Sequence, residues 1–258
     1  MEGYLYYDIR FLNKELTDND ICIEGRVHKI RHTGRMCFIV LRYQNNTLQV
    51  LGNKKVMNND SFNKLCKLTK ESIIRVGGKL KTTPFPIKAT TYNDIEFNIT
   101  DWTLINLSKD LPFDIDDIDS TEDYRNNVGQ SLRLDNRWLD LRTPINHSIM
   151  LIQSMVTNYF RTYLLKNNFI EIHSPKTIGV PSENGAEVFK LNYFGEEAFL
   201  AQSPQLYKQM AINSDFDRVF EIGPVFRAEK SFSNRHLCEY IGLDLEMTIT
   251  PGKNYREV

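Results

Sequence analysis

Residues 218–247 constrain the fold of this chain more than any other stretch. They read RVFEIGPVFRAEKSFSNRHLCEYIGLDLEM, in which two apolar-rich runs, 219–226 and 241–247, flank a polar loop. This order predicts two antiparallel strands joined by a long loop. Side-chain alternation then places Arg227 and Glu229 on one face of the first strand.

The same alternation places Asp244 and Glu246 together on one face of the second strand. Apolar side chains stand behind them, namely Leu243, Leu245 and Met247. The loop contributes three more basic side chains, Lys230, Arg235 and His236. Charged groups over an apolar backing are costly unless they are paired or face a ligand, so we expect a polyanionic ligand here. The alternative for an Arg and a Glu two positions apart is an ordinary solvated surface pair.

Charge is unevenly distributed along the 258 residues, although the formal net charge is only −1. Residues 1–108 carry 16 Lys and Arg against 11 Asp and Glu, whereas residues 109–123 carry one Lys against seven acids. The basic first module is therefore the expected polyanion binder. The scattered cysteines form no CxxC pair, which argues against zinc and favours a reduced intracellular compartment. We find no signal peptide and no membrane-spanning run.

Short alternating segments fill the first module, which we assign to residues 1–108. We expect strands at 21–27, 36–42, 47–51, 71–81 and 95–104, a basic turn at 28–34 and a helix at 56–68. Five strands with one intervening helix predict an OB-fold barrel, which commonly binds single-stranded nucleic acid. Candidates for its outer face are Phe38, Arg42, Gln49 and Glu96. The alternative for Phe38 is an ordinary place in the barrel core.

An acidic connector, residues 109–135, contains Pro112 and is predicted to be a hinge rather than a packed element. At its end the sequence RLDNRWLDLR, residues 133–142, predicts arginines that pair with Asp135 and Asp140 at a domain junction. The third module, residues 136–258, starts with apolar residues at helical spacing over 146–166. A strand at 169–172 and Pro175 follow. The whole pattern predicts an α+β protein.

Ser203 and Pro204 predict the start of a helix, with Ser203 as N-cap and Pro204 in the first helical position. Gln205 and Lys208 then share a helical face beside free backbone N–H groups and the positive end of the helix dipole. A carboxylate would be held well there with Lys208 as its counter-charge. A solvated lysine is the alternative, because lysine is rarely buried.

The string from Phe226 to Met247 resembles motif 2 of the class II aminoacyl-tRNA synthetases, and is most similar to aspartyl enzymes of the archaeal and eukaryotic type. The segment QSPQ-x-x-K, residues 202–208, resembles the same group, whereas asparaginyl enzymes usually lack a lysine at position 208. The helix, strand and proline at 146–175 resemble motif 1, which forms the family's homodimer interface. The resemblance therefore implies an OB-fold followed by part of a class II antiparallel-sheet catalytic domain.

The resemblance implies a role for each matching residue. Arg227 and Glu229 would be catalytic, with Arg227 on the α-phosphate of ATP and the amino-acid carboxylate. The ATP-binding set is Arg227, Ala228, Glu229, Arg235, His236, Leu237 and Tyr240. The aspartate-binding set is Glu183, Ser203, Gln205, Lys208, Arg227 and Asp244. On the barrel, Phe38, Gln49 and Glu96 stand where the family contacts the tRNA anticodon.

The implied activity is that of an aspartate–tRNA ligase, which activates L-aspartate with ATP and Mg²⁺ and charges tRNA(Asp) in the cytoplasm. An asparaginyl-tRNA synthetase is the alternative. No Gly-x-Gly-x-x-Arg element follows Met247, so we expect motif 3 and the metal ligands to lie outside these 258 residues. The chain alone is then expected to be an inactive tRNA-binding and dimerising module, and an extended reading frame to be active.

Overall fold

The computed structural model describes residues 3–119, 128–182, 188–231, 233, 235–249 and 251–256. Its contacts divide the chain into two compact units, Met1–Ser148 and Ile149–Val258. Each unit has its own sheets and its own clusters of buried apolar side chains.

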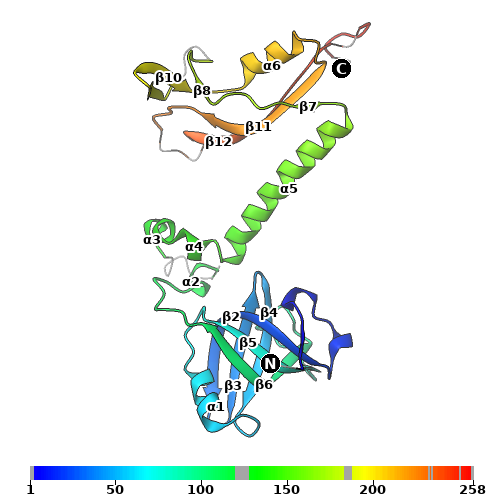
Figure 1. Cartoon of the computed structure of the whole chain (residues 1–258), viewed down its shortest axis with the longest axis vertical. Coiled ribbons are helices and arrows are strands. Elements are labelled where there is room, and N and C mark those ends of the chain that lie inside the picture. Colours follow the sequence, from blue (N-terminus) through cyan, green and yellow to red (C-terminus); the bar gives the residue numbers. More distant parts are fainter. Residues whose placement is uncertain are drawn as a thin grey trace. The chain divides into compact units, whose positions relative to one another are not determined.

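A closed five-stranded barrel forms most of the first unit (Figure 1). The sheet runs in the order β1-β2-β3-β4-β6-β5, and pairing of β2 with β5 closes it. The β4–β6 pairing is parallel, whereas the other barrel ladders are antiparallel. The strands are β1 (Leu5–Tyr6), β2 (Asp20–Thr33), β3 (Met36–Tyr43), β4 (Asn46–Asn53), β5 (Ile73–Thr82) and β6 (Ile95–Asn106).

The barrel is held by one large apolar core. Alternate residues of each strand point inward, as Ile21 and Ile23 do on β2, and are completely buried. Helix α1 (Asn59–Cys66) adds Phe62 and Leu65 to this core. Asn58 caps the start of the helix by accepting a hydrogen bond from the Ser61 N–H. The predicted basic turn at 28–34 is wrong, because β2 continues to Thr33 and its outer half pairs with β3.

The acidic connector is not simply a hinge, since its first part packs. Phe113 and Ile115 are buried with Leu139 in a small second core of the first unit. Asp116 lies beside His28 and Lys29 of β2, with oxygen-to-nitrogen distances of 3.2 and 3.1 Å. This part of the chain contains α2 (Asp116–Asp119), α3 (Gln130–Asp135) and α4 (Arg137–Asp140).

The arginines after the connector are paired, but not all as predicted. Asp140 is buried and accepts hydrogen bonds from Arg133, at 2.7 Å, and from Arg137. Arg142 instead bonds to Glu71 of the barrel segment, at 2.9 Å, and lies over the Trp138 ring. Asp140 therefore pairs with two of these arginines, as the sequence predicted, and these contacts lie within the first unit.

The second unit contains two small sheets. One has the order β12-β11-β7 and the other β8-β10-β9, and α6 packs against β11 and β12. The strands are β7 (Ile170–Glu171), β8 (Thr177–Ile178), β9 (Lys190–Tyr193), β10 (Glu196–Leu200), β11 (Arg218–Phe226) and β12 (Glu239–Met247). The helices are α5 (Pro144–Lys166), which begins in the first unit, and α6 (Gln205–Ile212).

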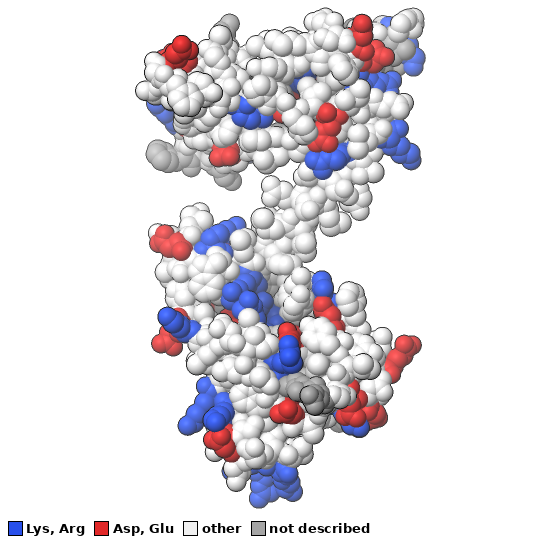
Figure 2. Space-filling model, in the orientation of Figure 1, with Lys and Arg blue, Asp and Glu red and all other residues white. Residues whose placement is uncertain are grey.

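Among the helices of the described residues, α5 is the longest, with 23 residues, and it buries little of its apolar surface in the chain. Near the C-terminal end of the helix, Phe160 and Leu164 pack against Phe169 and Phe220. Its exposed apolar residues are Ile149, Met150, Leu151, Ile152, Met155, Val156, Tyr159, Tyr163 and Leu165. Figure 2 shows most of the helix as an uncharged surface. Among the described residues, no helix meets the length and hydropathy that crossing a membrane requires.

Candidate active site

The two strands predicted from residues 218–247 are present as the antiparallel pair β11 and β12. Their register places Glu221 opposite Asp244 and Val219 opposite Glu246, so these four side chains share one face of the sheet. Phe220 lies on the other face and packs against Leu164 of α5. Helix α6 therefore meets the acidic face of the strand pair.

Lys208 of α6 is the centre of that face. Its side chain is only 3% exposed, and its Nζ lies 3.1 Å from Glu246 Oε2 and in direct contact with Asp244 Oδ1. The carbonyl oxygen of Leu245 is a third acceptor, at 3.3 Å. Gln205, one helical turn earlier, donates from Nε2 to the same Glu246 oxygen at 2.9 Å. Gln205 and Lys208 therefore do share a face, as their spacing predicts.

Ala201, in the segment before α6, is held by two backbone hydrogen bonds. Ala201 donates its N–H to the Lys176 carbonyl, and its own carbonyl accepts from Phe226 N–H, both at 2.9 Å. The predicted helix start is one residue early, because α6 begins at Gln205 and Pro204 occupies the N-cap position without a side-chain cap. Ser203 still contacts the helix start, accepting from the Gln205 N–H at 3.4 Å.

A buried carboxylate, which the sequence analysis missed, lies on the same face of the strand pair. Glu221 is 3% exposed and accepts hydrogen bonds from Ser174 Oγ at 2.6 Å, Ser174 N–H at 3.0 Å and Lys176 Nζ at 2.7 Å. The sequence did contain an indication of this site, namely an acid inside the apolar run Phe220–Ile222, because an acid that is buried in a strand needs a dedicated partner.

The motif 2 loop starts earlier than predicted. Strand β11 ends at Phe226, so Arg227 and Glu229 lie in the loop and not on a strand face. Arg227 N–H donates to the Cys238 carbonyl at 3.0 Å, and Glu229 N–H donates to the Arg227 carbonyl at 2.7 Å. Arg227, Ala228 and Glu229 are half-buried, and the Nε atom of Arg227 is inaccessible to solvent.

The rest of this loop is exposed where the structure describes it. His236 Nδ1 lies 2.6 Å from Ser233 Oγ, and Arg235 and Leu237 are also exposed, as is Tyr240 on β12. Glu183 lies outside the described residues. In the described part of the chain, no group of three or more His, Cys, Asp and Glu side chains could hold a metal ion.

On the barrel, the three residues assigned to nucleic acid come together. Gln49 and Glu96 are register partners on β4 and β6, and Gln49 Nε2 donates to Glu96 Oε2 at 3.1 Å. Phe38 and Gln49 both line a cavity of about 450 Å³, and the Arg31 guanidinium lies 4.7 Å from the Phe38 ring centre. Phe38 is half-buried, so it is not part of the sealed core. The fourth outer-face candidate, Arg42, is buried instead.

Comparison with known proteins decides the family. The model of the class II tRNA synthetases (D, K and N) matches residues 129–258, and that of the OB-fold nucleic acid binding domain matches residues 21–105. The chain belongs to the class II tRNA synthetase family. The predicted α+β architecture, an OB-fold followed by part of a class II catalytic domain, is thereby confirmed.

Relatives of this class II synthetase chain include the human protein named aspartate–tRNA ligase, cytoplasmic. It is 40% identical over 261 residues, which span 97% of this chain and 51% of the human protein. The structure of an aspartyl-tRNA synthetase from Entamoeba histolytica matches with a TM-score of 0.82 and 38% identity, over 99% of this chain and 52% of that one.

An asparaginyl-tRNA synthetase from Pyrococcus horikoshii, solved with asparaginyl-adenylate, matches less well. Its TM-score is 0.79 and its identity 29%, over 96% of this chain and 53% of that one. The synthetase chain described here therefore spans about half the length of the relatives it matches.

Proposed function

We propose that this chain acts in an aspartate–tRNA ligase, which joins L-aspartate to ATP as aspartyl-adenylate and transfers the aminoacyl group to tRNA(Asp). The observation that carries the proposal is the buried Lys208, placed between Asp244 and Glu246. The similarity to proteins named aspartate–tRNA ligase supports the same activity.

Substrate selection follows from the alternating charges at Lys208. An amino acid with a second carboxylate brings an ammonium group for Asp244 and a side-chain carboxylate for Lys208. Asparagine offers only a neutral amide to the lysine, whereas the aspartate side chain offers a charge-assisted hydrogen bond, which is the stronger of the two. Ser203 and Gln205 border the same group and would fix the substrate's orientation, and Glu183 would face its ammonium.

The reaction needs no nucleophile from the protein, because the substrate carboxylate attacks the α-phosphate of ATP and pyrophosphate leaves. The protein's task is to position two anions and to stabilise the charge that develops. We assign Arg227 to the α-phosphate and the substrate carboxylate, and Glu229 to the adenine side. The other nucleotide contacts would be Ala228, Arg235, His236, Leu237 and Tyr240.

Enzymes that use ATP generally bind it as its Mg²⁺ complex, and magnesium prefers oxygen ligands. The described residues do not provide a cluster of ligands for a metal ion. We therefore assign no step to a metal held by this chain.

The barrel is proposed to bind the anticodon of the tRNA on the face formed by Phe38, Gln49 and Glu96. Phe38 could stack on a base, and the two polar side chains could hydrogen bond to base edges. A homodimer through α5 and a cytoplasmic location complete the proposal. They are supported by the exposed apolar face of α5 and by the names of the relatives.

Pyrophosphate exchange by the natural gene product tests this function. We expect label from pyrophosphate to enter ATP when aspartate is present, and not when asparagine replaces it. Arg227→Ala should lower the rate on the order of 10²–10³-fold, the scale of a lost transition-state donor. Lys190→Gln, in an exposed ion pair with Glu197, is the matched control and should leave the rate unchanged.

Exchange with asparagine alone would replace this proposal with an asparaginyl enzyme. Absence of exchange with either amino acid, together with retained tRNA binding, would leave a non-catalytic tRNA-binding module.

A further inference from the structure

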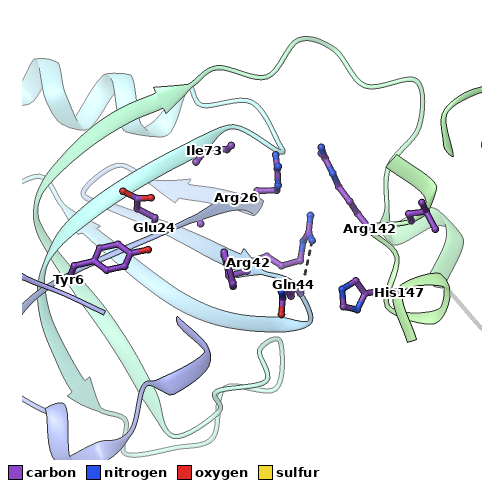
Figure 3. A pocket seen from close by; sticks show the side chains of 11 residues that line it. Tyr6, Glu24, Arg26, Arg42, Gln44, Ile73, Arg142 and His147 are labelled. Carbon is purple, nitrogen blue, oxygen red and sulfur yellow. Dashed lines mark hydrogen bonds between the residues drawn. The ribbon is translucent and has the colours of Figure 1, made fainter. Parts of the chain in front are cut away.

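A cavity of about 440 Å³ in the first unit has no role in the proposed function. It lies beside the middle of β2 and the end of β3 and is bordered by the segment that follows α4 (Figure 3). Its volume falls within the ~300–1,000 Å³ typical of small-molecule sites. It shares no residue with the Lys208 group or with Phe38, Gln49 and Glu96.

Three arginines from separate parts of the chain line this cavity. Arg26 comes from β2, Arg42 from β3 and Arg142 from the segment after α4. Figure 3 shows their guanidinium ends directed toward the same space. Like charges gathered in this way repel unless anions neutralise them.

One buried carboxylate serves all three arginines. Glu71, 3% exposed, accepts from Arg42 at 2.6 Å and from Arg142 at 2.9 Å, and lies 3.9 Å from Arg26 Nε. The other acid at the cavity, Glu24, is already paired with Arg75. The three cations therefore exceed their own carboxylate by two charges.

Burial makes this excess costly. Arg42 is only 6% exposed, and its Nε atom is buried without a hydrogen-bond partner in the chain. Burial, followed by the nearby charge of Arg142 and of Arg42, lowers the pKa of Arg26 below its usual value, and Glu71 offsets this only in part. A buried guanidinium with an unused donor is stabilised by an anion that can accept from it.

The rest of the cavity wall indicates the kind of anion. Tyr6 and Tyr43 line it with exposed aromatic rings, and Ile73 adds an apolar contact. A planar guanidinium pairs well with phosphate oxygens, and a phosphate monoester carries close to the two negative charges that are missing. Tyrosine rings stack on nucleobases.

We propose that this cavity binds a nucleotide, with its phosphate on Arg26, Arg42 and Arg142 and its base against Tyr6 and Tyr43. The nucleotide is either a free mononucleotide or one residue of an RNA strand, and only the second source rests on the proposed function. The site lies outside the residues assigned to ATP, aspartate and the anticodon.

Calorimetric titration of the full chain with uridine monophosphate tests the proposal. We expect binding at submillimolar concentration to weaken about tenfold in Arg26→Gln, the scale of one charge-assisted hydrogen bond. Arg26 is the best arginine to change, because its 3.9 Å approach to Glu71 is the longest of the three. Lys79→Gln, which removes a charge from an exposed ion pair on the adjacent strand β5, is the matched control, and Phe38→Ala tests the anticodon face. Both should bind like the unchanged chain.

The side-chain ¹⁵N signal of the Arg42 Nε–H locates the ligand independently, and should shift during the titration. Competition then separates the sources. A five-nucleotide RNA that displaces the monophosphate at tenfold lower concentration identifies an RNA strand, and failure to displace it identifies a free nucleotide. Absence of binding at millimolar concentration, equal binding by Arg26→Gln, or loss of binding in Phe38→Ala alone would overturn the proposal. None of these measurements depends on pyrophosphate exchange.

Discussion

Lys208 shows how much the meaning of a single residue depends on its surroundings. From spacing alone, a helical lysine is normally solvated, whereas here its side chain is almost completely buried. Asp244 and Glu246 account for that burial, because each supplies a carboxylate oxygen to the ammonium group. The cluster carries one negative charge in excess before any substrate arrives.

Replacing the lysine tests this arrangement. Lys208→Met keeps the length of the side chain but leaves two carboxylates facing one another, so we expect the free energy of unfolding to fall by roughly 1–3 kcal/mol. Urea unfolding at neutral pH measures the loss. Lys190→Met, from an exposed pair, is the control and should change the midpoint little. Equal effects of the two changes would contradict a special role for the cluster.

At the scale of the element, hydrophobic alternation predicted the strands well and their ends less well. Strands β3, β4, β5 and β6 differ from the predicted ranges by a few residues at most, because each buries every second side chain. The outer half of β2 was missed because 28–33 is polar and mostly exposed, although it pairs with β3. Strand pairing between exposed polar residues cannot be recognised from the hydrophobicity of the sequence.

The connector was predicted to be a hinge because the prediction gave more weight to its acidic charge than to two apolar residues. Phe113 and Ile115 were the signal for packing, and both are buried. Asp116 adds a specific contact to β2. Burial disfavours its charged form, but hydrogen bonds and charge from His28 and Lys29 outweigh burial and lower its pKa from 3.8 to about 2.

A pH dependence follows from this ion pair. Because the pKa of Asp116 is lower in the folded chain, its contribution is present above about pH 4 and is lost as pH falls from about 4 to about 2. We expect Asp116→Asn to lower the free energy of unfolding by about 1 kcal/mol at pH 5, a value reduced for solvent screening. The difference from the unchanged chain should vanish toward pH 2. Exposed Asp110→Asn is the control, and a difference that persists in acid would exclude the ion pair as its cause.

At the scale of the whole molecule, the candidate site could be predicted only in part. Lys208 contacts Asp244, and Gln205 lies beside them on Glu246, because helix and strand spacing fix which side chains share a face. Their role in binding aspartate stays a prediction. Glu221 with Ser174 and Lys176 could not be predicted, since these contacts join β11 to a segment some 45 residues away. The Glu71 cluster was missed for the same reason.

The apolar surface of α5 also belongs to this scale. At 100° per residue, Ile152, Met155, Val156 and Tyr159 share one face of the helix. We expect Ile152→Glu to shift the protein from dimer to monomer in sedimentation velocity, because it places a charge within a buried apolar contact. Ser154→Glu, on the opposite face of α5, is the control and should leave the dimer intact. A monomer before any substitution would refute the proposed pairing.

The bond between Arg142 and Glu71 has a practical consequence for dissecting the protein. An excised barrel that stopped at residue 108, the limit expected from composition, would lose Arg142, Asp116 and the small second core that contains Phe113 and Ile115. Glu71, whose backbone has a left-handed φ of 65°, would then keep Arg42 and the more distant Arg26 as its cationic partners. The compact unit that contains all of these contacts runs to Ser148, forty residues further along the chain, and is therefore the piece to express.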